Sequence, residues 1–144
     1  MARYSTITLS DREFEAMYST RAMMKIAEMC GGDLQLLPEF LKADGNNVEV
    51  MHRLCMIITE LINGAAAARN AEIDFGLEQG EKRKFITAEM LMDIITPGEV
   101  VTAQNSVYGI IGLCSEFELP EGIKMEETDV DLQEMKAEQL KEKN

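Results

Sequence analysis

One apolar stretch, residues 48–68, constrains the fold of this chain more than any other part of the sequence. It reads VEVMHRLCMIITELINGAAAA, and apolar residues recur in it at intervals of three and four. On a helix of roughly 100° per residue, one set falls within a wedge about 120° wide. The members of this set are Met51, Leu54, Cys55, Ile58, Leu61, Ile62 and Ala65. The polar residues collect on the other side: Glu49, His52, Arg53, Glu60 and Asn63. The pattern predicts a central helix capped by Asn47, with neighbours on more than one flank because Val50 and Ile57 widen the apolar side.

Length and charge limit what the rest of the chain can be. With 144 residues, of which 46% are hydrophobic, there is room for one domain that buries about two thirds of its unfolded surface. No run of about 18 apolar residues and no signal-peptide core occurs, so we expect a soluble, cytoplasmic protein. The 26 acidic residues outnumber the 14 basic ones and give a net charge of −12. This charge disfavours nucleic acid and anionic membranes as partners.

The first residues are expected to form a β-hairpin. Residues 5–18, STITLSDREFEAMY, alternate on both sides of Ser10-Asp11, which is typical of two strands joined by a turn. The competing interpretation is that Ser10-x-x-Glu13 is a capping box that opens a helix. The alternation favours the hairpin.

Two helical segments are predicted between the hairpin and the central helix. Ser19 or Thr20 caps the first, which ends at Gly31-Gly32. Asp33 caps a shorter piece over 34–42, which Pro38 shortens or kinks unless it lies in the first turn.

Two further helices are predicted after a charged linker. Thr87 caps the first, over 88–95, and Thr96-Pro97-Gly98-Glu99 opens the second with an N-cap, a proline at the first position and a capping glutamate. The second helix has one apolar face, formed by Val100, Ala103, Val107, Ile110, Ile111, Cys114 and Phe117. Gly109 and Gly112 each lower the stability of this helix by about 1 kcal/mol relative to alanine. We therefore expect another backbone, near residues 64–68, to pack closely against them.

The fold class that follows is mostly α: a short N-terminal β-hairpin, over about 5–18, followed by a bundle of four to five helices. Residues 1–118 are predicted to form a single domain. Residues 118–144 contain nine acidic residues and four lysines, and their apolar residues are too sparse for a core. Residues 119–144 are therefore predicted to be an acidic, mobile tail.

The residues that usually carry chemistry offer little here. Cys30, Cys55 and Cys114 lie far apart at apolar helical positions, which favours reduced core residues over disulfides or a metal site. Glu49-x-x-His52 resembles half of a di-iron carboxylate site, but the chain has no second histidine. A metalloenzyme is thus the weakest hypothesis. P-loop, GxGxxG, GxSxG and paired CxxC motifs are absent, and we predict no catalytic, cofactor-binding or metal-binding residue.

Methionine is the one unusual component, with eleven in the chain. Its flexible, polarisable side chain suits surfaces that accept varied apolar partners, although most methionines fill cores. Met56 falls among the polar residues of the central helix, and Met24 and Met92 flank the buried faces of their own helices. These three are the predicted partner-binding residues.

From Phe14 to Phe117, about 100 of the 144 residues, the order of features resembles a known family. The segments MYSTRAMMKIAEMCGG, LCMIITELINGAAAARNAEI and ITAEMLMDIITPGEV resemble the small tail assembly chaperones of siphophage- and myophage-like tails, prophages and gene transfer agents. The resemblance implies a non-enzymatic protein that coats the apolar tape-measure protein in the bacterial cytoplasm and helps recruit tail-tube subunits. It also implies absence from the finished particle and, in many members, a longer frameshifted product. It assigns no functional residues.

A hypothesis of another class stays open. An acidic phage-encoded inhibitor or adaptor could mimic DNA and occupy a nucleic-acid-binding host protein. It requires carboxylates arrayed at phosphate-like spacing, whereas the acidic residues here are scattered outside the tail. Either function is compatible with a homo-oligomer.

Overall fold

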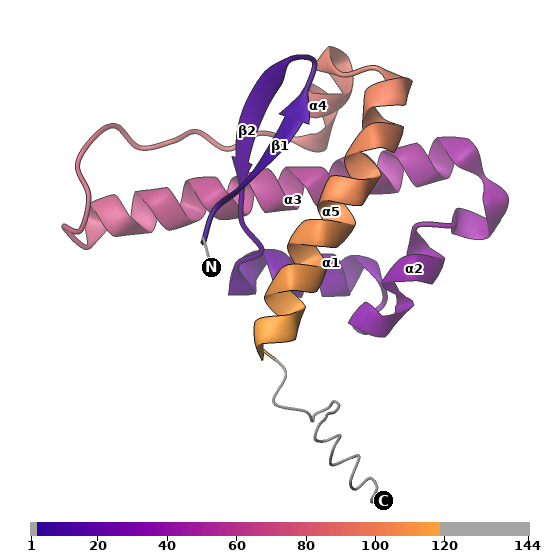
Figure 1. Cartoon of the computed structure of the whole chain (residues 1–144), viewed down its shortest axis with the longest axis horizontal. Helices are drawn as coiled ribbons and strands as arrows, with labels where there is room; N and C mark the ends of the chain where they lie inside the picture. The colour runs from indigo at the N-terminus through magenta and orange to yellow at the C-terminus, as the bar shows by residue number, and fades with distance from the viewer. Residues whose placement is uncertain (1–2, 119–144) are drawn as a thin grey trace, which may run out of the picture. The chain divides into compact units, whose positions relative to one another are not determined.

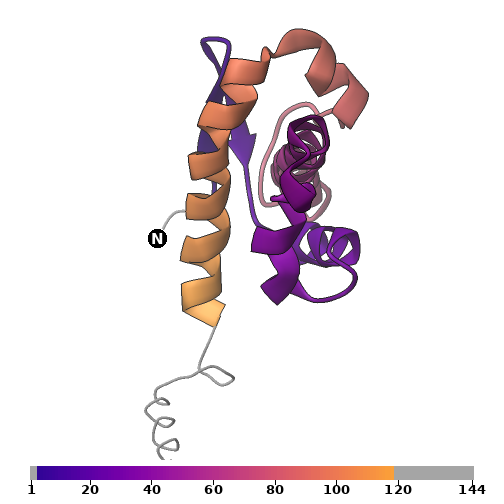
Figure 2. The same cartoon turned by 90° about the vertical axis from the view of Figure 1, so that its right-hand side faces the viewer.

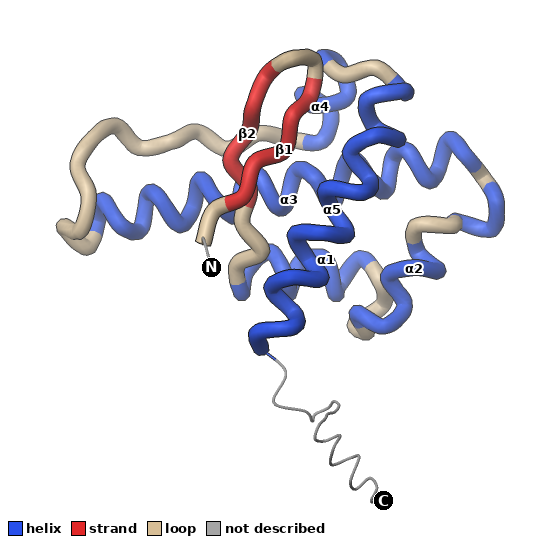
Figure 3. The backbone as a smooth tube through the Cα atoms, in the orientation of Figure 1, coloured by secondary structure: helices blue, strands red, loops and turns tan. Residues whose placement is uncertain are grey.

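In the computed structural model, which describes residues 3–118, an antiparallel two-stranded hairpin precedes five α-helices (Figures 1 and 3). The mostly helical fold class is confirmed. The chain divides into two compact units, Met1–Ile110 and Ile111–Asn144, so the boundary falls inside the last helix. The first unit contains the hairpin, four helices and the start of the fifth. The tail predicted for 119–144 lies outside the described residues, and it stays a prediction together with the boundary at 118.

The hairpin consists of β1 (Ser5–Leu9) and β2 (Arg12–Ala16), paired so that Ile7 lies opposite Phe14. Ser10 and Asp11 form the turn, and both have positive φ, as two-residue hairpin turns require. Ile7, Leu9 and Ala16 are buried. The alternative capping box at Ser10 and Glu13 is wrong, because Glu13 lies in β2.

The next helix, α1 (Thr20–Met29), begins and ends as predicted. The Oγ atom of Ser19 accepts the N–H of Ala22 at 3.1 Å, and Gly31 and Gly32 continue with φ of +81° and +95°. The single piece predicted over 34–42 is instead a 3-10 turn, η1 (Leu34–Leu36), followed by one α-helical turn, α2 (Leu37–Phe40). Pro38 lies in the first turn of α2, where its missing N–H costs no hydrogen bond.

The central helix, α3 (Asn47–Asp74), follows a second 3-10 turn, η2 (Ala43–Gly45). The predicted cap is wrong by one residue: Asn46 has extended backbone angles, and its side chain accepts the N–H of Glu49 at 3.1 Å. The predicted apolar wedge is confirmed for Leu54, Cys55, Ile58, Leu61, Ile62 and Ala65, all buried. Ile57 is buried too, and α3 packs against β2, α1 and α4 (Figure 1). Neighbours therefore lie on more than one flank, as expected.

Another backbone approaches α3 closely at Gly64. A Cβ atom there would lie 2.5 Å from the carbonyl oxygen of Met17 and 3.1 Å from Oγ of Ser19. The N–H of Met17 donates to the carbonyl of Leu61 at 2.9 Å, so the β2–α1 connection lies directly on the helix. A Cβ at Gly109 would meet no atom within 4 Å. A Cβ at Gly112 would meet none either, so the prediction that another backbone packs closely against Gly109 and Gly112 is wrong.

After α3, the linker over 75–87 turns back and runs alongside the helix (Figure 1). Two asparagines of α3 hold it: Asn63 exchanges hydrogen bonds with the backbone of Ile86, and Asn70 does so with the backbone of Arg83. Seven residues apart, the two asparagines lie on the same face of α3. These hydrogen bonds fix the position at which the linker ends and the next helix begins.

The last two helices are α4 (Ala88–Ile94) and α5 (Pro97–Glu118). Oγ1 of Thr87 accepts the N–H of Met90 at 3.2 Å, which confirms this cap. The predicted capping box is also confirmed: Thr96 N–H donates to Glu99 Oε1 at 2.7 Å, and Glu99 N–H donates to Thr96 Oγ1 at 3.4 Å. The α5 face that is buried in the first unit comprises Val100, Ala103, Val107 and Ile110.

Candidate functional site

Helix α4 exposes most of its apolar side chains. Leu91 is 1% exposed, whereas Met90, Met92 and Ile94 are 52%, 37% and 44% exposed. A surface helix normally carries its apolar residues on one buried stripe, and α4 carries them on several sides. Contiguous apolar surface left exposed marks interaction sites on soluble proteins.

A groove lies on one side of α4, where the starts of α3 and α5 approach it. It encloses about 460 Å³. We call it the α4 groove; its lining residues are Val48, Met51, His52, Cys55, Met92, Ile95, Pro97 and Val100. Cys55 and Val100 are buried in it, while Val48 is 79% exposed. Apart from His52, its lining side chains are apolar.

A second apolar hollow lies on the other side of α4 and encloses about 340 Å³. Phe14 and Ile86 form one wall of this Phe14 hollow, and α4 contributes Met90, Leu91, Asp93 and Ile94. The α4 groove and the Phe14 hollow together are called the α4 surface below. Its two halves meet at α4, so an apolar partner could use both.

The contact that fixes the corner after α4 is polar. Oγ of Ser10, in the hairpin turn, donates to Oε1 of Glu99 at 2.7 Å and also lies 3.3 Å from the carbonyl oxygen of Ile94. Hydrogen bonds from the backbone N–H of Thr96 and from Ser10 hold the pKa of Glu99 below its usual value, because they favour the ionised carboxylate. The hairpin turn and the α4–α5 corner are thereby tied together.

The structure does not bring the three predicted partner-binding methionines together. Met92 lines the α4 groove. Met24 is exposed on α1, and α1 and α4 lie on opposite sides of α3, as Figure 2 shows with α3 seen end-on. Met56 is partly buried on α3 and lines neither half of the α4 surface.

Several residues of the α4 surface were missed at the level of the sequence. Met90, Ile94 and Phe14 carry no motif, and Val48 was assigned to the central helix without a role. A signal did exist: AEMLMDI has large apolar residues at four of seven positions, too many for one face of a two-turn helix.

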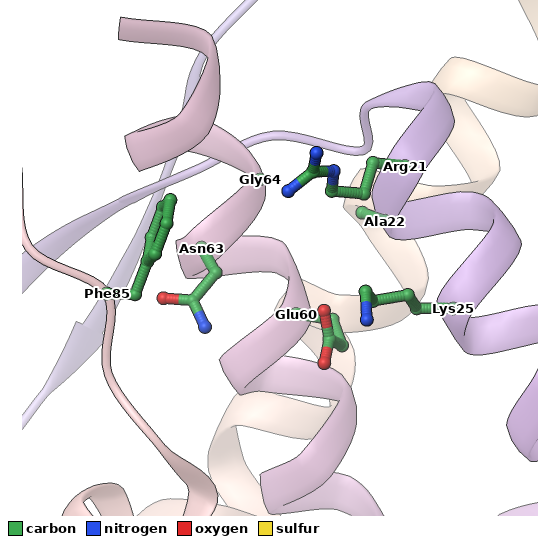
Figure 4. Close-up of a pocket in the computed structure, with 7 residues that line it drawn as sticks. All are labelled: Arg21, Ala22, Lys25, Glu60, Asn63, Gly64 and Phe85. Atoms are coloured by element: carbon green, nitrogen blue, oxygen red, sulfur yellow. The ribbon is translucent and has the colours of Figure 1, made fainter. Parts of the chain in front are cut away.

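A smaller, polar hollow of about 200 Å³ lies between α1 and α3 (Figure 4). Arg21 and Lys25 extend from α1 toward Glu60 and Asn63 of α3, and Phe85 of the linker closes one side. The amide of Asn63 is already bonded to the backbone of Ile86. The side chains of this hollow therefore mainly join the linker, α1 and α3.

His52, Cys30 and Cys55 carry described side chains of the types that serve metal or thiol chemistry. Nδ1 of His52 lies 3.8 Å from Oε2 of Glu49, and both side chains are substantially exposed. Among the side chains that the structure describes, no three His, Cys, Asp or Glu residues are grouped as metal ligands would be. Cys30 and Cys55 are buried free thiols, and burial raises the pKa of both. The side chain of Cys114 lies outside the described part.

Among the described helices, none combines the length and apolarity that crossing a membrane would need. Comparisons of the chain with known protein families, with curated proteins and with solved structures found no match. What the α4 surface binds has to be inferred from its own chemistry.

Proposed function

We propose that this protein is a non-enzymatic phage tail assembly chaperone that binds the tape-measure protein and helps recruit tail-tube subunits. It would act in the bacterial cytoplasm and be absent from the finished particle. The proposal rests on the order of elements that resembles this class of chaperone and on the α4 surface. The observation that carries it is the exposure of Met90, Met92 and Ile94 beside two apolar hollows.

A chaperone of this kind needs no reaction centre. An apolar helical client aggregates through the faces that it has not yet buried, and a protein that binds those faces shifts the client away from aggregation by mass action. Methionine side chains suit the task because they adapt to differently shaped apolar partners. Met51, Met90 and Met92 all line the α4 surface.

The alternative of a DNA mimic is less favoured. A mimic needs unpaired carboxylates in an array, whereas several carboxylates here form ion pairs. The pairs are Glu15 with Arg69, Glu49 with Arg53, Glu72 with Arg3 and Asp74 with Lys82.

The test is co-expression with a fragment of a phage tape-measure protein. The fragment should be largely insoluble alone and should become soluble and co-purify when the chaperone is present. The double variant Met92→Glu/Ile94→Glu should lose this effect, and Met24→Glu, a matched change on the far side of α3, should keep it. A fragment that stays equally insoluble with and without the protein would contradict the proposal.

The recruitment of tail-tube subunits is tested by a separate binding measurement. Purified tail-tube protein should be retained on immobilised chaperone only when the tape-measure fragment is also bound. Retention that is the same with and without the fragment would remove the recruiting role.

A further inference from the structure

We infer that the α4 surface takes an amphipathic α-helix whose apolar face is flanked by lysine or arginine. The inference rests on the proposed function only in that both use the same surface. It goes beyond it by stating the conformation and the charge of the segment that binds.

The lining of the surface argues for a helical occupant. His52 and Asp93 are the only lining residues with polar side chains in the two hollows. An extended peptide placed there would leave its own N–H and C=O groups without partners, and this loss is costly in apolar surroundings. A helix satisfies these groups internally and presents only side chains, as in other helix-in-groove complexes.

The size and plasticity of the surface fit such a helix. The α4 groove and the Phe14 hollow enclose about 460 and 340 Å³ and lie on either side of α4. Apolar side chains spaced at three and four residues could therefore enter both hollows while the bound helix crosses α4. Met90 and Met92 can adjust to the shape of the side chains that enter.

The charge around the surface argues for a basic occupant. No lysine or arginine occurs between residues 85 and 118, whereas Glu89 and Asp93 are exposed on α4 itself. Among the cations of neighbouring elements, Arg53 pairs with Glu49 at 3.2 Å and donates to the carbonyl oxygen of Phe40 at 2.8 Å.

On the linker, Lys82 pairs with Asp74, and Arg83 and Lys84 share a hollow with the carboxylates Glu13 and Glu15. Glu89 and Asp93, by contrast, form no ion pair with any described lysine or arginine.

The same charges disfavour a second copy of this chain as the occupant. Two α4 surfaces placed face to face would bring Glu89 and Asp93 of one copy toward those of the other, at a net charge of −12 per chain. Like charges facing each other across an interface oppose association, whereas a cationic rim on the partner favours it.

The experiment uses two synthetic helical peptides of about 18 residues, both with leucines at helical spacing, one with lysine and one with glutamate at the polar positions. Binding to the full chain is measured by fluorescence anisotropy. The lysine peptide should bind at least roughly tenfold more tightly than the glutamate peptide, and its affinity should fall as sodium chloride rises from about 50 to about 500 mM.

Matched variants separate a site from general attraction to an acidic protein. Glu89→Lys/Asp93→Lys should remove or reverse the preference for the lysine peptide. Glu28→Lys/Glu78→Lys changes the net charge equally at exposed positions away from α4 and should leave most of the preference intact. Met92→Glu should lower the affinity for the lysine peptide by roughly tenfold or more, and Met24→Glu should leave this affinity unchanged. Circular dichroism of each variant checks that it is folded.

Three results would overturn the inference. They are equal binding of the two peptides, equal effects of the two double charge variants, and a dimer that protects α4 from hydrogen exchange without peptide. If the tape-measure fragment is still kept soluble in those cases, the proposed function survives while this inference fails. If the lysine peptide binds at α4 but the fragment stays insoluble, the inference stands and the proposed function fails.

Discussion

Asn63 holds the backbone of Ile86 with both halves of its amide: Nδ2 donates to the carbonyl oxygen at 2.8 Å, and Oδ1 accepts the N–H at 2.9 Å. Asn70, two turns later in α3, makes the same pair of bonds with Arg83 at 3.0 and 2.7 Å. The linker does not pair with the β-hairpin, so its backbone N–H and C=O groups need other hydrogen-bond partners. The two asparagine side chains provide them at Ile86 and Arg83. They fix the linker beside α3 and so place α4.

The two asparagines should differ in what their removal costs. Asn63→Ala leaves a part-buried N–H and C=O without partners and should lower the free energy of unfolding by about 1–3 kcal/mol. Asn70→Ala leaves the N–H and C=O of Arg83 exposed, where water can bond to them. This variant should lower the free energy of unfolding by only about 0.5–1 kcal/mol. Urea unfolding measures both, and faster hydrogen exchange at the Ile86 amide should accompany the first variant alone. Equal losses in the two variants would contradict this account.

Gly64 lies against another backbone, whereas Gly109 faces open space, so the two glycines provide a second pair of variants. Gly64→Ala forces a Cβ against the carbonyl of Met17 and should destabilise the fold by about 1–3 kcal/mol. Gly109→Ala adds a Cβ in open space within a helix and should stabilise it by up to about 1 kcal/mol. Thermal unfolding shows the sign of each change. A destabilising Gly109→Ala would mean that another backbone approaches α5 after all.

What the sequence predicted well depends on neighbours a few positions apart. The caps at Ser19 and Thr87 and the capping box from Thr96 to Glu99 each involve residues three positions apart, so propensity and spacing suffice. The sequence predicts the cap of α3 one residue late because Asn46 and Asn47 have the same side chain. Their backbone angles, which the sequence does not show, decide between them.

What could not be predicted depends on contacts between distant residues. Nothing near Gly64 in the sequence indicates that Met17 lies against it, so the sequence instead predicts a close approach between residues 64–68 and the glycines Gly109 and Gly112. The α4 surface is a similar case. The position of Met92 on its helix predicts it as a binding residue, but the hollow formed by Met90 and Ile94 also needs Phe14 and Ile86, which are distant or separate in the sequence.

The carboxylate of Glu99 predicts a pH dependence. Its pKa is held below the ordinary value of 4.5 in the folded protein, so it stabilises the fold above that pH and loses this contribution as the pH falls through the lowered value. Glu99→Gln should lower Tm at pH near 7, and the difference from the wild type should become smaller as the pH falls from about 4.5 to about 3. An NMR titration should show that Ser10→Ala raises the pKa of Glu99 toward 4.5. A Tm difference that is the same at both pH values would contradict the assignment.

The buried cysteines predict slow alkylation. Burial raises the pKa of Cys30 and Cys55, which lowers the thiolate fraction, and it also shields the sulfur atoms. Near pH 8, iodoacetamide should modify both at least about tenfold more slowly in the native protein than in guanidinium chloride, as followed by mass spectrometry. Native Cys55 that reacts as fast as the unfolded chain would show that the floor of the α4 groove is open to solvent.

Neighbouring residues of α4 should separate stability from binding. Leu91 is 1% exposed, so Leu91→Ala should cost about 2–5 kcal/mol of unfolding free energy. Met90→Ala and Ile94→Ala remove side chains that are about half exposed, and each should cost well under half of that amount. In the tape-measure co-expression assay the order should reverse, because Met90 and Ile94 present much more exposed side chain to the client than Leu91, which is 1% exposed in the same hollow. If Met90→Ala and Ile94→Ala destabilise the fold as much as Leu91→Ala does, these side chains belong to the core and the α4 surface has no part in binding.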